Sequence, residues 1–275
     1  MTHPDASPST PTDDVARRFL FEQADIRGET VHIHRVLEEI LANHQYAPGV
    51  RVLLGEFIAA AVLLSSTLKF EGKLILQVRS EGQIPLLMVE CNNQFEVRAI
   101  ARGAQEATAT EFEQLLTGGQ LAITIDPDKG QRYQGIVPLL ENSLARSLDA
   151  YFEQSEQLHT RFWLASDGTY AAGVLLQQLP AQLVEDPEQR EQQWQHVITL
   201  ATTLTDAELL DLLAQDILAR LFHEDPLRLF ESRAVRFHCT CSRERTYRAL
   251  ASIQPGEVRE LLEEIGHIIM DCEFC

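Results

Sequence analysis

The stretch "VLLGEFIAAAVLLSSTLK", residues 52–69, is the most apolar segment of the chain, and it decides the fold. Its uninterrupted apolar run, Phe57 to Leu64, is far shorter than the roughly 20 residues that a membrane-spanning helix needs. Glu56 lies inside the stretch and Lys69 at its end. We therefore expect a long, buried central helix in a globular domain and no membrane partner.

Strand-like segments lie on both sides of this helix. Before it, "TVHIHRV" (30–36) leads into the helix-like "LEEILANH" (37–44). After it come "KLILQVRSEG" (73–82), "IPLLMVECN" (84–92) and "QFEVRAIAR" (94–102), three runs rich in Val, Ile, Leu and Phe. Because turn-prone residues separate these three runs, they predict an antiparallel meander.

The remaining segments of this domain alternate without a repeated strand–helix–strand unit. We expect further strands at "QLAITID", "YQGIVPL", "TRFWLAS" and "YAAGVLLQQL", and a helix at "SLARSLDAYFEQSEQ" (120–126, 133–139, 160–166, 170–179 and 143–157). This order is typical of an α+β fold and not of a doubly wound parallel sheet. The prediction is a sheet-rich core domain over residues 15–180.

Residues 181–232 differ in composition and predict a helical linker. "VEDPEQREQQWQ" (184–195) is charged and glutamine-rich, which is typical of an exposed connector helix. A capping-box pattern, Thr205 with Glu208, begins the next helix. Along it, apolar side chains repeat at helical spacing: Leu209, Leu213, Ile217 and Leu221. Such a face is usually buried, and a linker without its own core borrows stability from a neighbour.

Four of the five cysteines form two tight pairs, in "HCTCSRERTYRAL" (238–250) and "CEFC" (272–275). The four thiolates of Cys239, Cys241, Cys272 and Cys275 fit the closed, tetrahedral shell of a structural zinc ion, with Zn–S near ~2.3 Å. The module at residues 233–275 is too small to bury an adequate core, so zinc would supply its folding energy. Each pair is also spaced to close as a disulfide, which makes a redox switch chemically available.

Other nearby residues have simpler interpretations. His238 and His267 are not needed by a complete thiolate set, and Cys91 is expected to be a buried small hydrophobe. The arginines around the first pair either stabilise thiolates or form a solvated basic face, and these two interpretations stay open: Arg236, Arg243, Arg245 and Arg248.

The net charge and the N-terminal residues limit which cellular compartment and which classes of partner we expect. The formal net charge is −18, which disfavours nucleic acid as a partner. Residues 1–14 carry no basic and apolar signal segment and predict a disordered tail. We expect a cytoplasmic protein, where paired cysteines more often hold metal or perform redox chemistry than form structural disulfides.

Five motifs together resemble the redox-regulated 33 kDa heat-shock chaperones of bacteria, the 33 kDa chaperonins. They are "LLGEFIAAAVLLSSTLKFEGKLILQ", "LAITIDPDKGQRYQGIVPL", "YFEQSEQL", "CTCSRER" and "CEFC". The resemblance extends over nearly the whole chain from about Phe19. The family pattern continues past Cys275 with a short segment containing a further strand, so we expect the zinc module to lack part of its packing.

The resemblance implies an ATP-independent holdase, not an enzyme. Reduced, the protein would be an inactive monomer with zinc on the four cysteines. Oxidised, it would release zinc and form the Cys239–Cys241 and Cys272–Cys275 disulfides, the metastable linker would unfold, and a homodimer would capture unfolding client proteins. The candidate client-binding residues are those of the linker's apolar face: Leu209, Leu213, Ile217, Leu221 and Phe222.

Two other classes remain as alternatives. A thiol-disulfide oxidoreductase would use the C-x-x-C as its active pair, although no thioredoxin-like context surrounds Cys272. A zinc-ribbon nucleic-acid binder would use the arginines between 233 and 248, against the net charge of −18. Nucleotide chemistry has no support, because the chain carries no phosphate-binding glycine loop.

Overall fold

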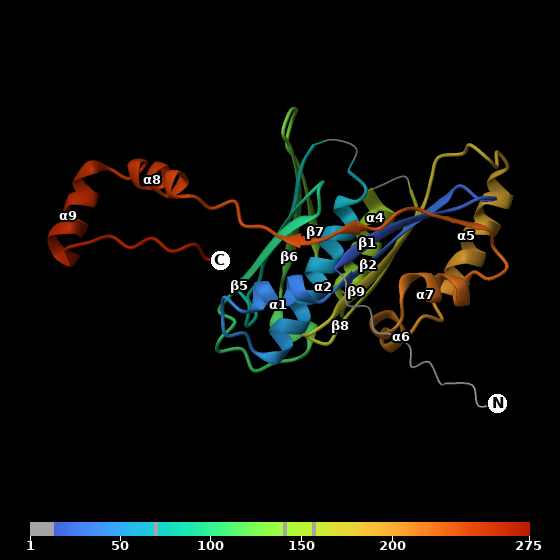
Figure 1. The fold of residues 1–275 in the computed structure, drawn as a ribbon, viewed down its shortest axis with the longest axis horizontal. Helices are drawn as coiled ribbons and strands as arrows, with labels where there is room; N and C mark the ends of the chain where they lie inside the picture. The colour runs from blue at the N-terminus through green and yellow to red at the C-terminus, as the bar shows by residue number, and fades with distance from the viewer. Residues whose placement is uncertain (1–13, 69–70, 140–141, 156–157) are drawn as a thin grey trace, which may run out of the picture.

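The strands form two sheets, and the chain passes between them more than once (Figure 1). The computed structural model describes residues 14–68, 71–139, 142–155 and 158–275. Sheet 1 has the order β10-β1-β2-β9-β8, with β11 also paired to β1. Its strands are β1 (Val15–Phe21), β2 (Ile26–Ile33), β8 (Thr160–Ser166), β9 (Ala171–Gln178), β10 (Leu227–Leu229) and β11 (Arg233–Ala234). The predicted disordered tail lies outside the described residues, apart from Asp14.

Sheet 2 has the order β12-β5-β4-β3-β6-β7. Its strands are β3 (Gly72–Arg79), β4 (Leu86–Asn92), β5 (Glu96–Arg102), β6 (Gln120–Pro127), β7 (Tyr133–Pro138) and β12 (Arg236–Phe237). The pairs β3–β4 and β4–β5 are antiparallel, so the predicted meander is confirmed. Residues of β4 alternate between buried and half-buried, because one face of the sheet covers the core and the other carries polar side chains.

Helix α2 (Pro48–Ser65) is the centre of the core, as its sequence predicts. Proline begins the helix, where its missing N–H costs nothing. The helix packs against β2, β8 and β9 of sheet 1 and against β3, β4 and β5 of sheet 2. Although its length and apolarity would allow it to cross a membrane, 78% of the segment is buried inside the protein. A Cβ atom at Gly55 would lie 2.2 Å from Ser166 Oγ, so the close approach to sheet 1 requires glycine there.

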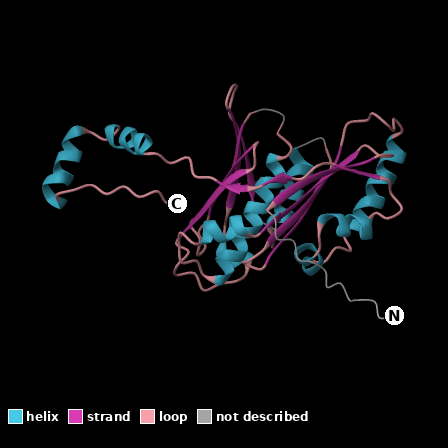
Figure 2. Cartoon of the chain, viewed as in Figure 1, coloured by secondary structure: helices cyan, strands magenta, loops and turns pink. Residues whose placement is uncertain are grey.

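Three short helices complete the body around α2. They are α1 (Arg35–Leu41), α3 (Phe112–Leu115) and α4 (Leu144–Ser155). Leu37 and Ile40 of α1 and Leu144 and Leu148 of α4 join the same buried cluster as α2. Helices and strands thus alternate without parallel crossover units, which confirms the α+β prediction (Figure 2).

The linker helices α5 (Pro187–Ala201), α6 (Asp206–Asp211) and α7 (Ala214–Leu221) cover the face of sheet 1 that α2 leaves free (Figure 1). The apolar cluster between them includes Phe19, Phe21, Val174, Leu176, Trp194, Val197, Leu209, Ile217 and Phe222. The expectation of an exposed connector helix is wrong for Trp194, which is only 4% exposed. Local composition could not reveal this, because the partner surface comes from strands far away in the sequence.

The predicted apolar stripe lies on two helices and not on one. Leu212 and Leu213 are extended, with ψ of 148° and 146°, and they separate α6 from α7. A twisted sheet turns away from a straight helix, so two short helices can both keep contact with sheet 1. The predicted capping box is confirmed: Thr205 and Glu208 each bond the other's backbone N–H.

After α7, residues 227–237 form an extended strap that runs from sheet 1 to sheet 2. Strands β10 and β11 pair antiparallel with β1, and β12 then pairs in parallel with β5. Beyond β12, α8 (Arg243–Ala251) and α9 (Pro255–Ile265) project away from the body, and the final residues return toward β5 (Figure 1). The two helices match the prediction, and no residue of either, both described throughout, is buried.

Candidate metal centre

The first cysteine pair lies between β12 and α8, and the second pair lies in the segment after α9. Cys239 follows β12, whose pairing continues with the N–H of His238 donating to Val97 O at 3.1 Å. Cys241 precedes Ser242, the N-cap of α8. Helix α9 ends at Gly266, with φ of 81°, and the chain turns there and returns to place Cys272 and Cys275 beside the first pair. The fold therefore brings together all four predicted ligands.

The sulfur positions fit a tetrahedral metal site. The Sγ atoms of Cys239 and Cys272 are 3.5 Å apart, and those of Cys241 and Cys275 are 3.3 Å apart. All four sulfur atoms lie within 4.8 Å of one another. Four ligands at the Zn–S distance of ~2.3 Å would be separated by about 3.8 Å, which lies inside this range. The donor set therefore fits the metal that the family resemblance implies.

All five cysteines are in the described part of the chain and are free thiols. The shortest sulfur contacts join the two motifs, whereas the expected disulfides would join the cysteines within each motif. The expected disulfides stay a prediction. Cys91 is fully buried away from the cluster, and burial raises the pKa of its thiol to about 12, as suits an inert core residue.

Proton affinity differs among the clustered thiols. Burial acts to raise the pKa of Cys239, but hydrogen bonds from the Cys241 backbone and Arg98 outweigh it and lower that pKa to about 7. The pKa of Cys275 is raised because its thiol donates to Cys241 and lies beside Cys239. Metal uptake must therefore release the protons that these thiols hold.

The arginine that supports this thiolate is not one of those expected from the sequence. Arg243, Arg245 and Arg248 bond Tyr247, Thr240 and Glu244, respectively. Arg98 of β5 instead places Nη1 3.6 Å from Cys239 Sγ. Sequence reasoning missed Arg98 because 141 positions separate it from Cys239 and no local motif marks it.

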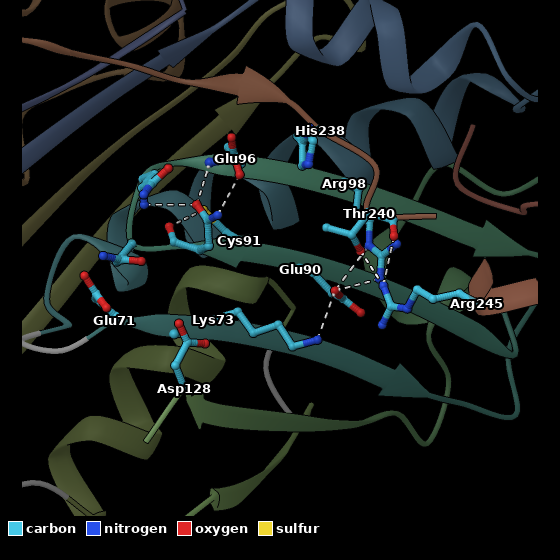
Figure 3. Close-up of a pocket in the computed structure, with 14 residues that line it drawn as sticks. Glu71, Lys73, Glu90, Cys91, Glu96, Arg98, Asp128, His238, Thr240 and Arg245 are labelled. Carbon is cyan, nitrogen blue, oxygen red and sulfur yellow. Dashed lines mark hydrogen bonds and ion pairs between the residues drawn. The ribbon is translucent and has the colours of Figure 1, made fainter. Parts of the chain in front are cut away.

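A polar cavity of about 560 Å³ lies beside the centre, between the outer face of sheet 2 and the chain around the first cysteine pair (Figure 3). Glu90 accepts from Arg98 at 2.8 Å and pairs with Lys73 at 3.5 Å. Burial acts to lower the pKa of Arg98, but Glu90 and Cys239 outweigh it, so the pKa is raised and the guanidinium stays charged. Thr240 and Arg245 close one side of the cavity.

The candidate client-binding residues lie elsewhere, over sheet 1. Leu209, Ile217 and Phe222 are buried, whereas Leu213 and Leu221 are half-buried. Phe222 meets Phe21 edge to face, with ring centroids 5.0 Å apart. The linker thus covers its own apolar face in this conformation, and the assignment to client binding stays a prediction.

Known proteins match nearly the whole length of the chain. The family described as "Hsp33 protein" matches residues 14–275. The chain is 52% identical over 268 residues to the 33 kDa chaperonin of Pseudomonas savastanoi pv. phaseolicola, covering 96% of this chain and 89% of that protein. It is 51% identical over 265 residues to the 33 kDa chaperonin of Azotobacter vinelandii, with 95% and 89% covered.

A solved structure has the same fold. The crystal structure of the 33 kDa chaperonin from Thermotoga maritima superposes with a TM-score of 0.81 at 21% identity, covering 95% of this chain and 92% of that one. The family match, the sequence relatives and the four-cysteine cluster agree with one another. The chain belongs to the Hsp33 family, the 33 kDa chaperonins.

Proposed function

We propose that this chain is a redox-regulated holdase, inactive while its four cysteines hold zinc and active once they are oxidised. Its family is a chaperone family and not an enzyme family, and chaperones of this kind bind unfolded proteins. The observation that carries the proposal is the cluster of four free thiols at the base of a module without a single buried helix residue.

The thiols have two roles in this proposal. Bound to them, zinc would supply the folding energy that the module lacks in buried surface. When hydrogen peroxide oxidises a pair, the two thiols lose two electrons and two protons, a sulfur–sulfur bond forms, and the peroxide O–O bond breaks to give two waters. Oxidation of Cys239 with Cys241 and of Cys272 with Cys275 consumes two peroxides and leaves no thiolate for the metal.

The linker would respond because it is continuous with the cysteines. Residues 227–237 run along β1 and then β5 directly into Cys239. The linker's apolar cluster is separate from the main core, so loss of the strap can release α5–α7 without unfolding the body. Release would expose Leu209, Leu213, Ile217, Leu221 and Phe222 together with the sheet face they cover, as a surface for unfolded client proteins and for a second copy.

The cytoplasm is the compartment in which this switch would operate, because its reducing conditions keep the four thiols available for zinc. The oxidised form would be a dimer and the reduced form a monomer. Neither nucleic acid nor a membrane is needed for the activity.

The alternative function, a thiol-disulfide oxidoreductase, needs an attacking thiolate in the C-x-x-C pair. In this structure the sulfur of Cys272 lies 3.5 Å from that of Cys239 and the sulfur of Cys275 lies 3.3 Å from that of Cys241, so each thiol of the pair contacts the other motif. Steady turnover of a small-molecule disulfide by the reduced protein would support the oxidoreductase over the holdase.

The test combines zinc release with protection of a client. The reduced, zinc-loaded protein is treated with hydrogen peroxide at raised temperature while a chromogenic chelator reports zinc and light scattering reports aggregation of a chemically unfolded client. We expect about one zinc per chain to leave and scattering to fall only after oxidation. The Cys91→Ala variant is the matched control and should behave as the wild type. Zinc release without gain of protection contradicts the proposal.

A further inference from the structure

The two residues inside the C-x-x-C motif contact the body directly. Glu273 and Phe274 lie between Cys272 and Cys275, and both meet arginines of β5. Those arginines are Arg98 and Arg102, four positions apart on the strand, so alternation places both on the face of sheet 2 turned away from α2. The pair of residues between the cysteines therefore has a matched pair of partners on the body.

Arg98 forms the inner half of this contact. Its guanidinium lies 4.2 Å from the centroid of the Phe274 ring, a cation–π geometry. The same group donates to Glu90 and to the Cys239 sulfur, and its side chain is only 11% exposed. One half-buried cation therefore contacts both cysteine motifs and Glu90 of the sheet, and Figure 3 shows its position beside Glu90.

Arg102 and the end of α1 form the outer half. Arg102 Nε donates to Glu273 Oε2 at 3.0 Å. His44 Nε2 donates to Glu273 O at 2.7 Å, and Asn43 Nδ2 donates to Phe274 O at 3.3 Å. Backbone carbonyls and side chains of the same two residues are thus held at once, so the site recognises a conformation of the loop as well as its side chains.

We infer that Arg98, Arg102, Asn43 and His44 form a docking site on the body that holds the C-x-x-C loop only while its cysteines face the other motif. In the reduced arrangement Cys272 points to Cys239 and Cys275 points to Cys241. A disulfide between Cys272 and Cys275 would turn both sulfurs toward each other and bend residues 273–274, which removes the docked conformation. The contacts between the C-x-x-C loop and β5 therefore depend on whether Cys272 and Cys275 are reduced or oxidised.

The docked loop and β12 of the strap both contact β5, so a change at the loop can affect the strap. The bonds that hold β12 to β5 include those from the N–H of Arg236 to Phe95 O at 3.0 Å and from the N–H of His238 to Val97 O at 3.1 Å. Arg98 contacts Cys239, which is the residue after His238. If the docked loop is lost, the end of β12 next to Cys239 loses this support and can separate from β5. This inference deepens the proposed switch and rests on it.

The first experiment weakens the docking site and measures two rates in the full-length, zinc-loaded, reduced protein. Phe274→Ala and Arg98→Met should each speed zinc transfer to a chelator by about 5- to 30-fold without oxidant, as expected for losing one partly buried cation–π or charge-assisted contact. Hydrogen exchange at the Arg236 and His238 amides should accelerate in parallel. Arg79→Met, which removes an exposed arginine from the end of β3 in the same sheet, is the matched control and should change neither rate.

The second experiment exchanges the charges of the outer contact. Arg102→Glu and Glu273→Arg should each speed zinc transfer, and the double variant should recover at least half of the loss, because the ion pair is restored with reversed polarity. Glu263→Arg on exposed α9 controls for the change in net charge. Rescue distinguishes a specific contact from general damage to the module.

Failure of this inference is separable from failure of the proposed function. If the wild type releases zinc and gains client protection while Phe274→Ala, Arg98→Met and both charge reversals keep wild-type zinc transfer and exchange, the docking site is overturned and the switch stands. If the variants lose zinc faster but the Arg236 and His238 amides exchange at the wild-type rate, transmission to β5 is overturned. If oxidation of the wild type gives no protection, the proposed function fails whatever the variants do.

Discussion

The body and the cysteine module are stabilised in opposite ways. In the body, 14 of the 18 residues of α2 are buried between two sheets. In the module, no residue of α8 or α9 is buried, and Leu262, Ile265 and Ile269 are 44%, 57% and 70% exposed. The body is therefore stabilised by burial of apolar surface, whereas the module has no such source in its helices and, in the proposed function, depends on zinc at its four thiols.

The linker lies between these extremes. Its helices bury Trp194, Leu209, Ile217 and Phe222, but they do so against one face of sheet 1 and outside the main core. A segment with this arrangement can leave the body at a lower free energy than global unfolding requires. The body, the linker and the module thus differ in how much apolar surface each buries.

Metal removal gives the largest expected effect and tests whether the module stays folded without metal. Structural zinc contributes about 10–16 kcal/mol in small zinc peptides, so chelation under reducing conditions should abolish hydrogen-exchange protection in α8 and α9. The body should keep its protection. The Cys241→Ser variant should reproduce the result without a chelator, whereas Cys91→Ala should keep zinc. Helices that stay protected without metal would show that the module has another source of stability.

Truncation of Phe57 tests the body's side. This ring is fully buried in α2, so Phe57→Ala should lower the free energy of unfolding by about 3–5 kcal/mol in denaturant titrations. Zinc content should stay at the wild-type value. Leu262→Ala in α9 is the matched truncation at an exposed site and should change the free energy of unfolding by less than about 0.5 kcal/mol. Equal losses from the two variants would show that the body and the module do not differ in buried apolar surface.

The surroundings of Glu56, between α2 and α6, predict that stability depends on pH. Its carboxyl lies in a cavity of about 770 Å³ with Asp149 and Arg146 of α4, Arg161 of β8 and Asp206 of α6. Burial, with Asp206 adding to it, raises the pKa of Glu56 from 4.5 to about 7. A folded-state pKa above the unfolded value stabilises the protein below about pH 4.5, and this contribution is lost as the pH rises through 7.

The Glu56→Gln variant should remove this dependence. At pH 8 it should be more stable than the wild type by about 2 kcal/mol, and the difference should shrink toward pH 5. Denaturant titrations at several pH values, followed by the fluorescence of Trp163 and Trp194, measure it. The exposed Glu39→Gln is the control. A variant that follows the wild-type pH profile would show that Glu56 is not the responsible group.

Two helix caps give the smallest effect and compare the linker with the module. Thr205 and Ser242 each accept a bond from a backbone N–H, those of Glu208 and Arg245 respectively. Thr205→Ala should lower the free energy of unfolding by about 1 kcal/mol and speed amide hydrogen exchange in α6. Ser242→Ala should destabilise α8 by a similar free energy and speed amide hydrogen exchange in α8 alone. Faster exchange in α6 after Ser242→Ala would indicate that the linker and the module are already coupled in the reduced state.

The sequence predicts the regular elements well, because their signals are local. The apolar run of α2, the alternating strands of the meander and the Thr205–Glu208 capping box all match the structure. The buried position of Trp194 and the break at Leu212 and Leu213 could not be predicted, because both depend on the shape of sheet 1. The spacing of the cysteine motifs predicts that the four thiols lie together, as they do, and their role as zinc ligands stays a prediction.

The amino-acid sequence by itself determined the class of fold, the identity of the four clustered cysteines and the need for something beyond burial to hold their module together. These properties follow from periodicity, spacing and chain length, which are local or additive. Only the tertiary structure decided that Arg98 supports Cys239, that Glu273 and Phe274 dock on β5, and that Glu56 faces Asp206. Those contacts join residues far apart in the chain, and which of them meet depends on how the whole chain packs around α2.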